Sequence, residues 1–202
     1  RGDVIEMPAG VRHWHGATRD SWFSQMVIYD AAWKPDGRYQ DTGNTDNAVT
    51  DEYYENLAPV EYANRSDTSY SMFRAGDEDL TLPTFNGPIR LADVVTEDNA
   101  AGAPAIHNVV FAPGVINAWH EHEAGQILIV TDGVGYHQIA GQPVEILRPG
   151  DVAVCPPGVR HWRGAAPNSR FSHLAANGRR GRVGVTWHEM LTSEEYQALP
   201  RP

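Results

Sequence analysis

Residues 114–133, GVINAWHEHEAGQILIVTDG, decide the fold of this chain. His120 and His122 stand two residues apart in this stretch, and on a β-strand such residues point to the same face of the sheet. Gln126 follows them across a turn and begins a run rich in Ile and Val. We therefore expect these three side chains to project together into the space between strands.

A second stretch, residues 150–162, GDVAVCPPGVRHW, contributes His161 from a strand that is distant in the sequence. Imidazole nitrogens are good ligands for Zn, Cu, Fe, Ni and Mn, and an amide oxygen is a weaker, neutral donor. A lone histidine is most often a structural residue, but here two glycine-framed spacings occur together. The sequence predicts a divalent metal ion bound by His120, His122, Gln126 and His161.

Short runs rich in Val, Ile and aromatic residues surround these two stretches. They lie at 107–111, 118–122, 127–131, 135–139, 144–147, 152–155 and 171–175. Gly and Pro separate them, as at Pro113-Gly114 and Pro149-Gly150. Short strands divided by turn signals at this spacing are typical of an antiparallel sandwich or barrel. The fold class predicted from this pattern is all-β.

The spacings within 114–133 and 150–162 resemble the two motifs of the cupin superfamily, and the resemblance extends over most of residues 105–176. It implies a double-stranded β-helix, the jelly-roll barrel of that family. The family pattern usually has Glu where this chain has Gln126. Because Gln is neutral, the metal would keep more positive charge, which favours an anionic or readily deprotonated ligand.

More narrowly, residues 118–131 and 148–152 are similar to small bacterial cupins whose site has three histidines and one glutamine. That group includes manganese-dependent hydroxynitrile lyases and members described as decarboxylase-like. The resemblance implies Mn as the cofactor, with Zn, Fe and Ni as the other choices. Those relatives have a histidine where this chain has Arg163, and an arginine can instead hold a carboxylate.

His173 and His107 are the candidates for moving a proton. His107 shares strand parity with apolar residues of its own run, and His173 lies on the strand after His161. An imidazole titrates near neutrality, so each can serve as a general base or can be a structural hydrogen-bonding group. The candidate catalytic residues are therefore His173, His107 and Arg163.

Other residues of these stretches are expected to serve packing. Trp119 and Trp162 adjoin metal ligands and should point to the opposite face of their strands. Cys155 is expected to be a small buried side chain and not a nucleophile, because no activating partner is evident. His137 is assigned to the surface or to packing. A single cysteine also excludes an internal disulfide.

The chain contains an internal repeat. Residues 2–14, GDVIEMPAGVRHW, return 148 residues later as residues 150–162. Thr50 and Thr192 then begin similar segments, in which a capping residue and an acidic first turn predict a short helix. We interpret the two copies as one module present twice, with a second, partial cupin module at the N-terminus.

The predicted domains follow from this repeat. They are the C-terminal half of a first cupin module at 1–63, with its upstream half absent from this chain, a surface connector at 64–86, and a complete cupin barrel with a C-terminal helix at 87–202. A half barrel leaves strand edges unpaired. We expect a cleaved or omitted upstream half to complete it in a two-cupin gene product. A second chain, or extra strands from residues 2–30, are the alternatives, and His13 would bind metal only in a completed site.

The formal net charge of −10 argues against a nucleic-acid partner, because phosphate binding needs clustered Lys and Arg. The basic cluster Arg179, Arg180 and Arg182 is interpreted as a solvated loop. No apolar stretch approaches the roughly twenty residues that span a bilayer, so no membrane partner is expected. The expected partners are a small-molecule substrate and either a second copy in a homodimer or the missing N-terminal half. The compartment stays open, with the cytoplasm favoured.

The predicted function is a metal-dependent lyase, decarboxylase or isomerase that acts on a small polar or anionic molecule. The metal would act as a Lewis acid while a pocket histidine moves the proton. Hydroxynitrile cleavage is one concrete version. An oxygen-dependent dioxygenase with iron, and a non-enzymatic module that binds a small metabolite, are the alternatives.

Overall fold

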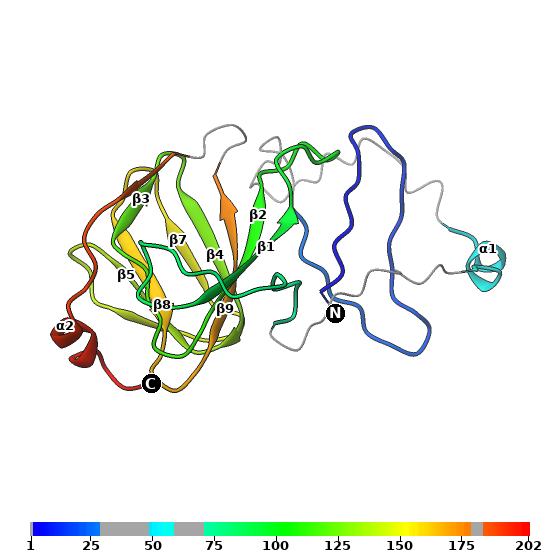
Figure 1. The fold of residues 1–202 in the computed structure, drawn as a ribbon. Coiled ribbons are helices and arrows are strands. Elements are labelled where there is room, and N and C mark those ends of the chain that lie inside the picture. The colour runs from blue at the N-terminus through cyan, green and yellow to red at the C-terminus, as the bar shows by residue number, and fades with distance from the viewer. Residues whose placement is uncertain (1, 29–48, 59–70, 179–183) are drawn as a thin grey trace.

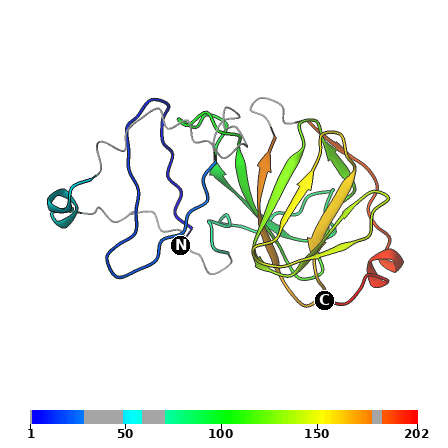
Figure 2. The same ribbon diagram turned by 180° about the vertical axis from the view of Figure 1, so that it is seen from behind.

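The computed structural model describes residues 2–28, 49–58, 71–178 and 184–202. Two five-stranded antiparallel sheets wrap around a common interior (Figures 1 and 2). The first holds, in spatial order, β1 (Ile89–Val95), β2 (Ile106–Phe111), β9 (Phe171–Asn177), β4 (Gln126–Gly133) and β7 (Val152–Cys155). The second holds β10 (Val185–Trp187), β3 (His120–His122), β8 (His161–Ala165), β5 (Gly135–Ile139) and β6 (Glu145–Leu147). The prediction of an all-β barrel is confirmed.

The predicted runs correspond closely to strands, with three differences. The run at 118–122 becomes a strand only at His120, because the backbone N–H of Ala118 donates to Thr84 instead of to a strand partner. β1 and β10 fall outside the predicted runs. β1 mixes charged with apolar positions, and β10 is a three-residue edge strand with exposed side chains, so both give a weak pattern.

The barrel interior divides into an apolar half and a polar half. The apolar half is a single cluster of buried side chains drawn from both sheets: Ile89, Val109, Phe111, Val115, Leu128, Val130, Leu147, Ala153, Ala165, Phe171 and Ala175. Each large member contributes about 1.5–3 kcal/mol by leaving water. The polar half holds His120, His122, Gln126, His161, Arg163 and His173, all buried. The apolar half supplies the stability that lets the polar half stay buried.

The turn before Gln126 requires a glycine. Gly125 has φ +76°, which residues with side chains rarely adopt, and a Cβ there would stand 2.8 Å from the carbonyl oxygen of Cys155. Its N–H donates to the carbonyl of His122, which closes the turn. This tight connection brings Gln126 back beside the histidines of β3.

The C-terminal segment covers the outer face of the second sheet. Trp162 is fully buried there with Ile116 and Tyr136, which confirms that it serves packing. The helix α2 (Ser193–Gln197) follows the cap Thr192, as the sequence predicts, and Thr192 and Glu195 form a reciprocal capping box. The hydroxyl of Tyr196 in this helix donates to the carbonyl of Ala165 at 2.9 Å, which ties the helix to β8.

The first copy of the repeat keeps the local contacts of the second. The helix α1 (Asp51–Glu55) follows the cap Thr50, and the hydroxyl of Tyr54 donates to the carbonyl of Ala17 at 2.9 Å, as Tyr196 does to Ala165. Nδ1 of His13 lies 3.0 Å from the carbonyl of Val11, matching the contact of 2.9 Å between His161 and Val159. Residues 2–28 nevertheless form no strand and add none to either sheet. The partial first module therefore stays a prediction.

The segment before β1 is held against the first sheet. Residues 64–70 of the predicted connector lie outside the described residues, but Ser71 is buried and its hydroxyl lies 2.7 Å from that of Ser172. Val4 and Phe73 pack on the same outer face. The basic cluster at 179–182 also lies outside the described residues. Across the described ranges, no helix has the length and apolar character needed to cross a bilayer.

Candidate metal centre

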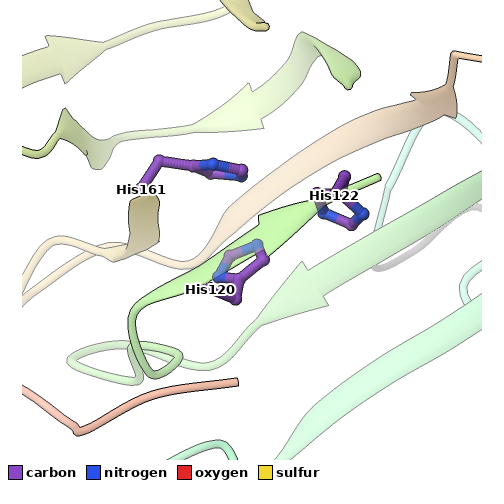
Figure 3. Close-up of side chains that lie close together, drawn as sticks. All are labelled: His120, His122 and His161. Atoms are coloured by element: carbon purple, nitrogen blue, oxygen red, sulfur yellow. The ribbon is translucent and has the colours of Figure 1, made fainter. Parts of the chain in front are cut away.

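Three histidines meet in the polar half of the barrel. His120 and His122 project from β3, and His161 lies opposite His120 as its register partner on β8 (Figure 3). One ring nitrogen from each of the three lies within 4.8 Å of the others, and all three side chains are buried. The ring centroids of His120 and His161 are 4.3 Å apart. Strand parity and cross-strand pairing therefore create the cluster together.

The backbone sets the tautomer of two of these rings. Nδ1 of His120 lies 2.9 Å from the carbonyl oxygen of Ala118, and Nδ1 of His161 lies 2.9 Å from that of Val159. A carbonyl only accepts, so each Nδ1 carries the proton and each Nε2 keeps a lone pair. Such a bond to the second nitrogen is how proteins orient metal-binding histidines.

Three polar atoms of the predicted ligands are buried without partners. Within the described residues, Nε2 of His122, Nε2 of His161 and Oε1 of Gln126 form no hydrogen bond. Unpaired buried polar atoms are rare in proteins and ask for an explanation. A cation that these atoms bind in common would satisfy all of them, so the side chains fit the predicted divalent metal.

Burial keeps the three imidazoles neutral. Desolvation, followed by the positive charge of Arg163, lowers the pKa of His122 to about 4 and that of His161 to about 3. The same two causes lower the pKa of His120 still further. A metal ion binds the deprotonated imidazole, so at neutral pH no proton has to leave before binding.

Arg163 lies inside the site, on β8 two residues after His161. Its Nη1 donates to Nε2 of His120 at 2.9 Å, and its Nε donates to Nε2 of His173 at 3.1 Å. Burial lowers the pKa of Arg163 to about 10, which leaves it charged at neutral pH. Among the described residues it has no carboxylate partner. The structure thus places Arg163, a predicted site residue, in a direct hydrogen bond with the predicted metal ligand His120.

His173 is fully buried on β9, next to the rings of Phe111 and Phe171. Burial and the charge of Arg163 lower its pKa well below the usual value. Because the guanidinium only donates, Nε2 of His173 must be the accepting nitrogen. In this arrangement its lone pair is already engaged.

His107 lies outside the histidine cluster. It stands on the inner face of β2 in register with Ala175, and Nδ1 is 2.8 Å from Oδ1 of Asp93 on β1. Its side chain is 30% exposed. In the described part of the chain it makes no hydrogen bond or ring contact with the three histidines, so the structure does not place it at the metal ligands.

Comparison with known proteins agrees with this architecture. Residues 107–170 match the family model of the cupin domain. (R)-mandelonitrile lyase of Granulicella tundricola is 43% identical over 114 residues, which are 56% of this chain and 86% of that protein. The chain belongs to the cupin family. A crystal structure of a cupin-like protein from Thermotoga maritima is 38% identical with a TM-score of 0.57, over 62% of this cupin and 93% of that chain.

Two neighbours of the site are not foreseen from the sequence. The ring of Trp187 on β10 lies 4.7 Å from the ring of His120, and Asn177 at the end of β9 accepts a hydrogen bond from Nε2 of Gln126 at 3.0 Å. Trp187 faces His120 because β10 pairs with β3. The three exposed residues of β10 give no pattern from which this pairing could be predicted. Asn177 could have been found by continuing the strand parity of His173.

The cupin interior also gives Cys155 a partner that the sequence analysis did not find. Nε2 of His137 lies 3.3 Å from its sulfur, and Nδ1 of His137 lies 2.8 Å from Oε2 of Glu145. No partner of Cys155 is evident in the sequence, because only the packing of the two sheets places His137 across the interior from it. Burial nevertheless raises the pKa of the thiol to about 11, so Cys155 stays protonated, and His137 is a packing residue that is fully buried.

The histidine cluster is shielded from solvent. A hollow of about 520 Å³ borders α1 and another of about 250 Å³ lies beside α2, and neither includes a residue of the histidine site. His120 and His161 expose no surface to solvent.

Proposed function

We propose that this cupin is a metal-dependent enzyme of the lyase, decarboxylase or isomerase kind, acting on a small polar or anionic molecule. The supporting observation is the set of buried ligand atoms, Nε2 of His122, Nε2 of His161 and Oε1 of Gln126, that have no hydrogen-bond partner among the described residues. The resemblance to (R)-mandelonitrile lyase favours cleavage of a hydroxynitrile as the concrete reaction.

The proposed ligands are His120, His122, Gln126 and His161. A divalent ion held there, with Mn as the first expectation and Zn, Fe or Ni as the others, would supply Lewis acidity toward a bound oxygen. All four ligands are neutral, so they leave the full ionic charge available to the substrate. That property suits a substrate whose oxygen gains negative charge during reaction.

His107 is the residue that we propose as the general base. When Asp93 accepts from its Nδ1–H, Nε2 of the neutral ring has the lone pair, and the side chain is 30% exposed. A carboxylate that orients an imidazole in this way is a recurring arrangement of catalytic bases. His173 is less suited as long as Arg163 occupies its accepting nitrogen.

For a cyanohydrin, the proposed step breaks one carbon–carbon bond and transfers one proton. Nε2 of His107 would take the hydroxyl proton as the bond between the carbinol carbon and the nitrile carbon breaks. The electron pair of that bond leaves with cyanide, and the proton returns to it, so the products are an aldehyde and hydrogen cyanide. In this step the nearby positive charge of Arg163 would favour the cyanide anion that leaves.

The test is an activity screen on protein reloaded with one metal at a time. We expect mandelonitrile cleavage, followed by the absorbance of benzaldehyde, with Mn and its loss after chelation. His107→Gln should lower kcat by about a hundredfold or more, the usual size of a general-base contribution. His13→Gln, an exposed histidine of the first copy, is the matched control and should retain activity.

The alternatives give different results in the same screen. Oxygen uptake with Fe would favour a dioxygenase. Full metal loading without conversion of cyanohydrins or of small carboxylic acids would contradict the proposal and favour a binding module.

A further inference from the structure

Arg163 is a buried cation without a buried anion. Its side chain lies in the barrel with the whole residue 6% exposed, and both of its hydrogen bonds go to imidazoles. Among the described residues no carboxylate forms an ion pair with it. Burying a charge is costly unless a partner of opposite charge compensates it. The protein retains an arginine here at a cost that its own side chains do not offset.

The other groups around Arg163 carry no negative charge. Its two hydrogen-bond partners are imidazoles, Gln126 is an amide, and the buried polar side chains among the described residues include no carboxylate. The carboxylate of Glu145 is 60% exposed and reaches the interior only through His137. A divalent ion at the histidines would add further positive charge to this space. Within the described part of the chain no group supplies the missing negative charge, and a bound anion is the partner that this arrangement favours.

One lone pair limits what His120 can bind. Its Nδ1–H is committed to the carbonyl of Ala118, so Nε2 is its single accepting atom, and Nη1 of Arg163 occupies that atom. Nε2 cannot serve Arg163 and a cation together. When a cation binds, the guanidinium must release His120, and Nη1 then needs a new acceptor inside the barrel.

We propose that Arg163 is the anion-binding residue of this site and that its ligand is a small 2-hydroxycarboxylate. The planar guanidinium presents paired N–H groups that match a carboxylate. A hydroxyl on the adjacent carbon is the group from which His107 would take a proton. This inference rests on the proposed metal site, and within the proposed function it favours an anionic substrate of the decarboxylase or isomerase kind over a neutral cyanohydrin.

The two roles of Arg163 predict effects of opposite sign. Arg163→Gln removes both the charge that repels a metal ion and the donor that competes for His120, so Mn(II) should bind more tightly, by about tenfold or more. The same change should reduce the preference for an anionic ligand to the part that the metal charge supplies. A residue that only supports the fold would weaken both kinds of binding, and Arg163→Lys, which keeps the charge, should retain part of the preference.

The experiment uses the full chain and two ligands of equal size. Calorimetry first measures Mn(II) affinity on metal-free protein, and then glycolate and its neutral analogue glycolamide are titrated into the Mn-loaded protein. We expect glycolate to bind about tenfold or more tightly than glycolamide, since a charge-assisted hydrogen bond contributes this much. Arg163→Gln should bind glycolate with a clearly smaller advantage over glycolamide than the native chain, because only the charge of the metal then favours the carboxylate.

The outcomes separate the two proposals. Equal affinities of glycolate and glycolamide for the Mn-loaded native chain would overturn the role of Arg163 while leaving the metal site intact, and this comparison requires no variant to fold. Failure of the native chain to bind Mn, Zn, Fe or Ni would overturn the metal-dependent function itself, and the anion site with it.

Discussion

Gln126 donates from Nε2 to Oδ1 of Asn177 at 3.0 Å, and this one bond decides which end of its amide faces the histidines. An amide has a donor and an acceptor end, and only the oxygen attracts a cation. With Nε2 turned toward β9, the buried Oε1 is left for the site. Asn177 therefore orients a proposed metal ligand without contacting the metal.

Removing Asn177 should weaken metal binding. Partners of metal ligands typically contribute about 10- to 100-fold in affinity, so Asn177→Ala should raise the Kd for Mn(II) by about that factor. Asn177→Asp keeps an acceptor for Nε2 of Gln126 and should bind at least as well as the native chain. Calorimetric titration measures both, and an unchanged Kd in Asn177→Ala would show that the amide needs no such support.

The histidine cluster should make the metal-free barrel sensitive to acid. Burial, and then the charge of Arg163, hold the pKa of His122 at about 4 and of His161 at about 3, against 6.5 for an ordinary histidine. Between about pH 6.5 and pH 4 the unfolded chain binds protons that the folded chain does not, so the free energy of unfolding falls as pH falls. Each such group contributes about 1.4 kcal/mol per pH unit within the window, and none above it.

Urea unfolding at about pH 7, 6 and 5 measures this slope. His161→Gln removes one of the titrating groups, and its free energy of unfolding should fall less steeply with acidification than that of the native chain. Identical slopes in the two proteins would show that His161 does not resist protonation in the folded state.

The ligand cluster was predictable because it follows from local rules. His120 and His122 share a face by strand parity, and Gln126 returns through a turn that Gly125 makes possible. His161 required the longer motif, whose second spacing places it opposite His120. These relationships depend on residues close together in the sequence. The same holds for the surrounding strands, which short apolar runs predict.

The interactions that tune the site were not predictable in the same way. The sequence identifies Arg163 as a site residue by its position. Its hydrogen bonds to His120 in the same sheet and to His173 in the opposite sheet depend on how the two sheets pack. His137 reaches Cys155 only because β5 and β7 face each other across the interior. Such contacts depend on the packing of strands that are far apart in sequence, and no periodicity in either strand encodes them.

The repeat offers a matched pair of hydrogen bonds for a stability test. Tyr196→Phe removes the bond to Ala165 that ties α2 to the barrel, and should lower the free energy of unfolding by about 1 kcal/mol. Tyr54→Phe removes the equivalent bond to Ala17, which lies outside both sheets, and should leave the barrel transition unchanged. Urea unfolding followed by tryptophan fluorescence measures both, and equal losses would show that the two copies unfold as one unit.

Cys155 should be unreactive in the folded protein despite its contact with His137. The thiolate is the reactive form, and burial raises the thiol pKa to about 11, so only about one molecule in a thousand carries a thiolate at about pH 8. A disulfide reagent whose reaction with a thiol changes its absorbance should therefore label the native chain far more slowly than the same chain in urea. Because the sequence holds one cysteine, every labelling event reports on Cys155. Rapid, complete labelling of the folded chain would mean that His137 activates the sulfur, and that the Glu145–His137–Cys155 chain of hydrogen bonds has a chemical function of its own.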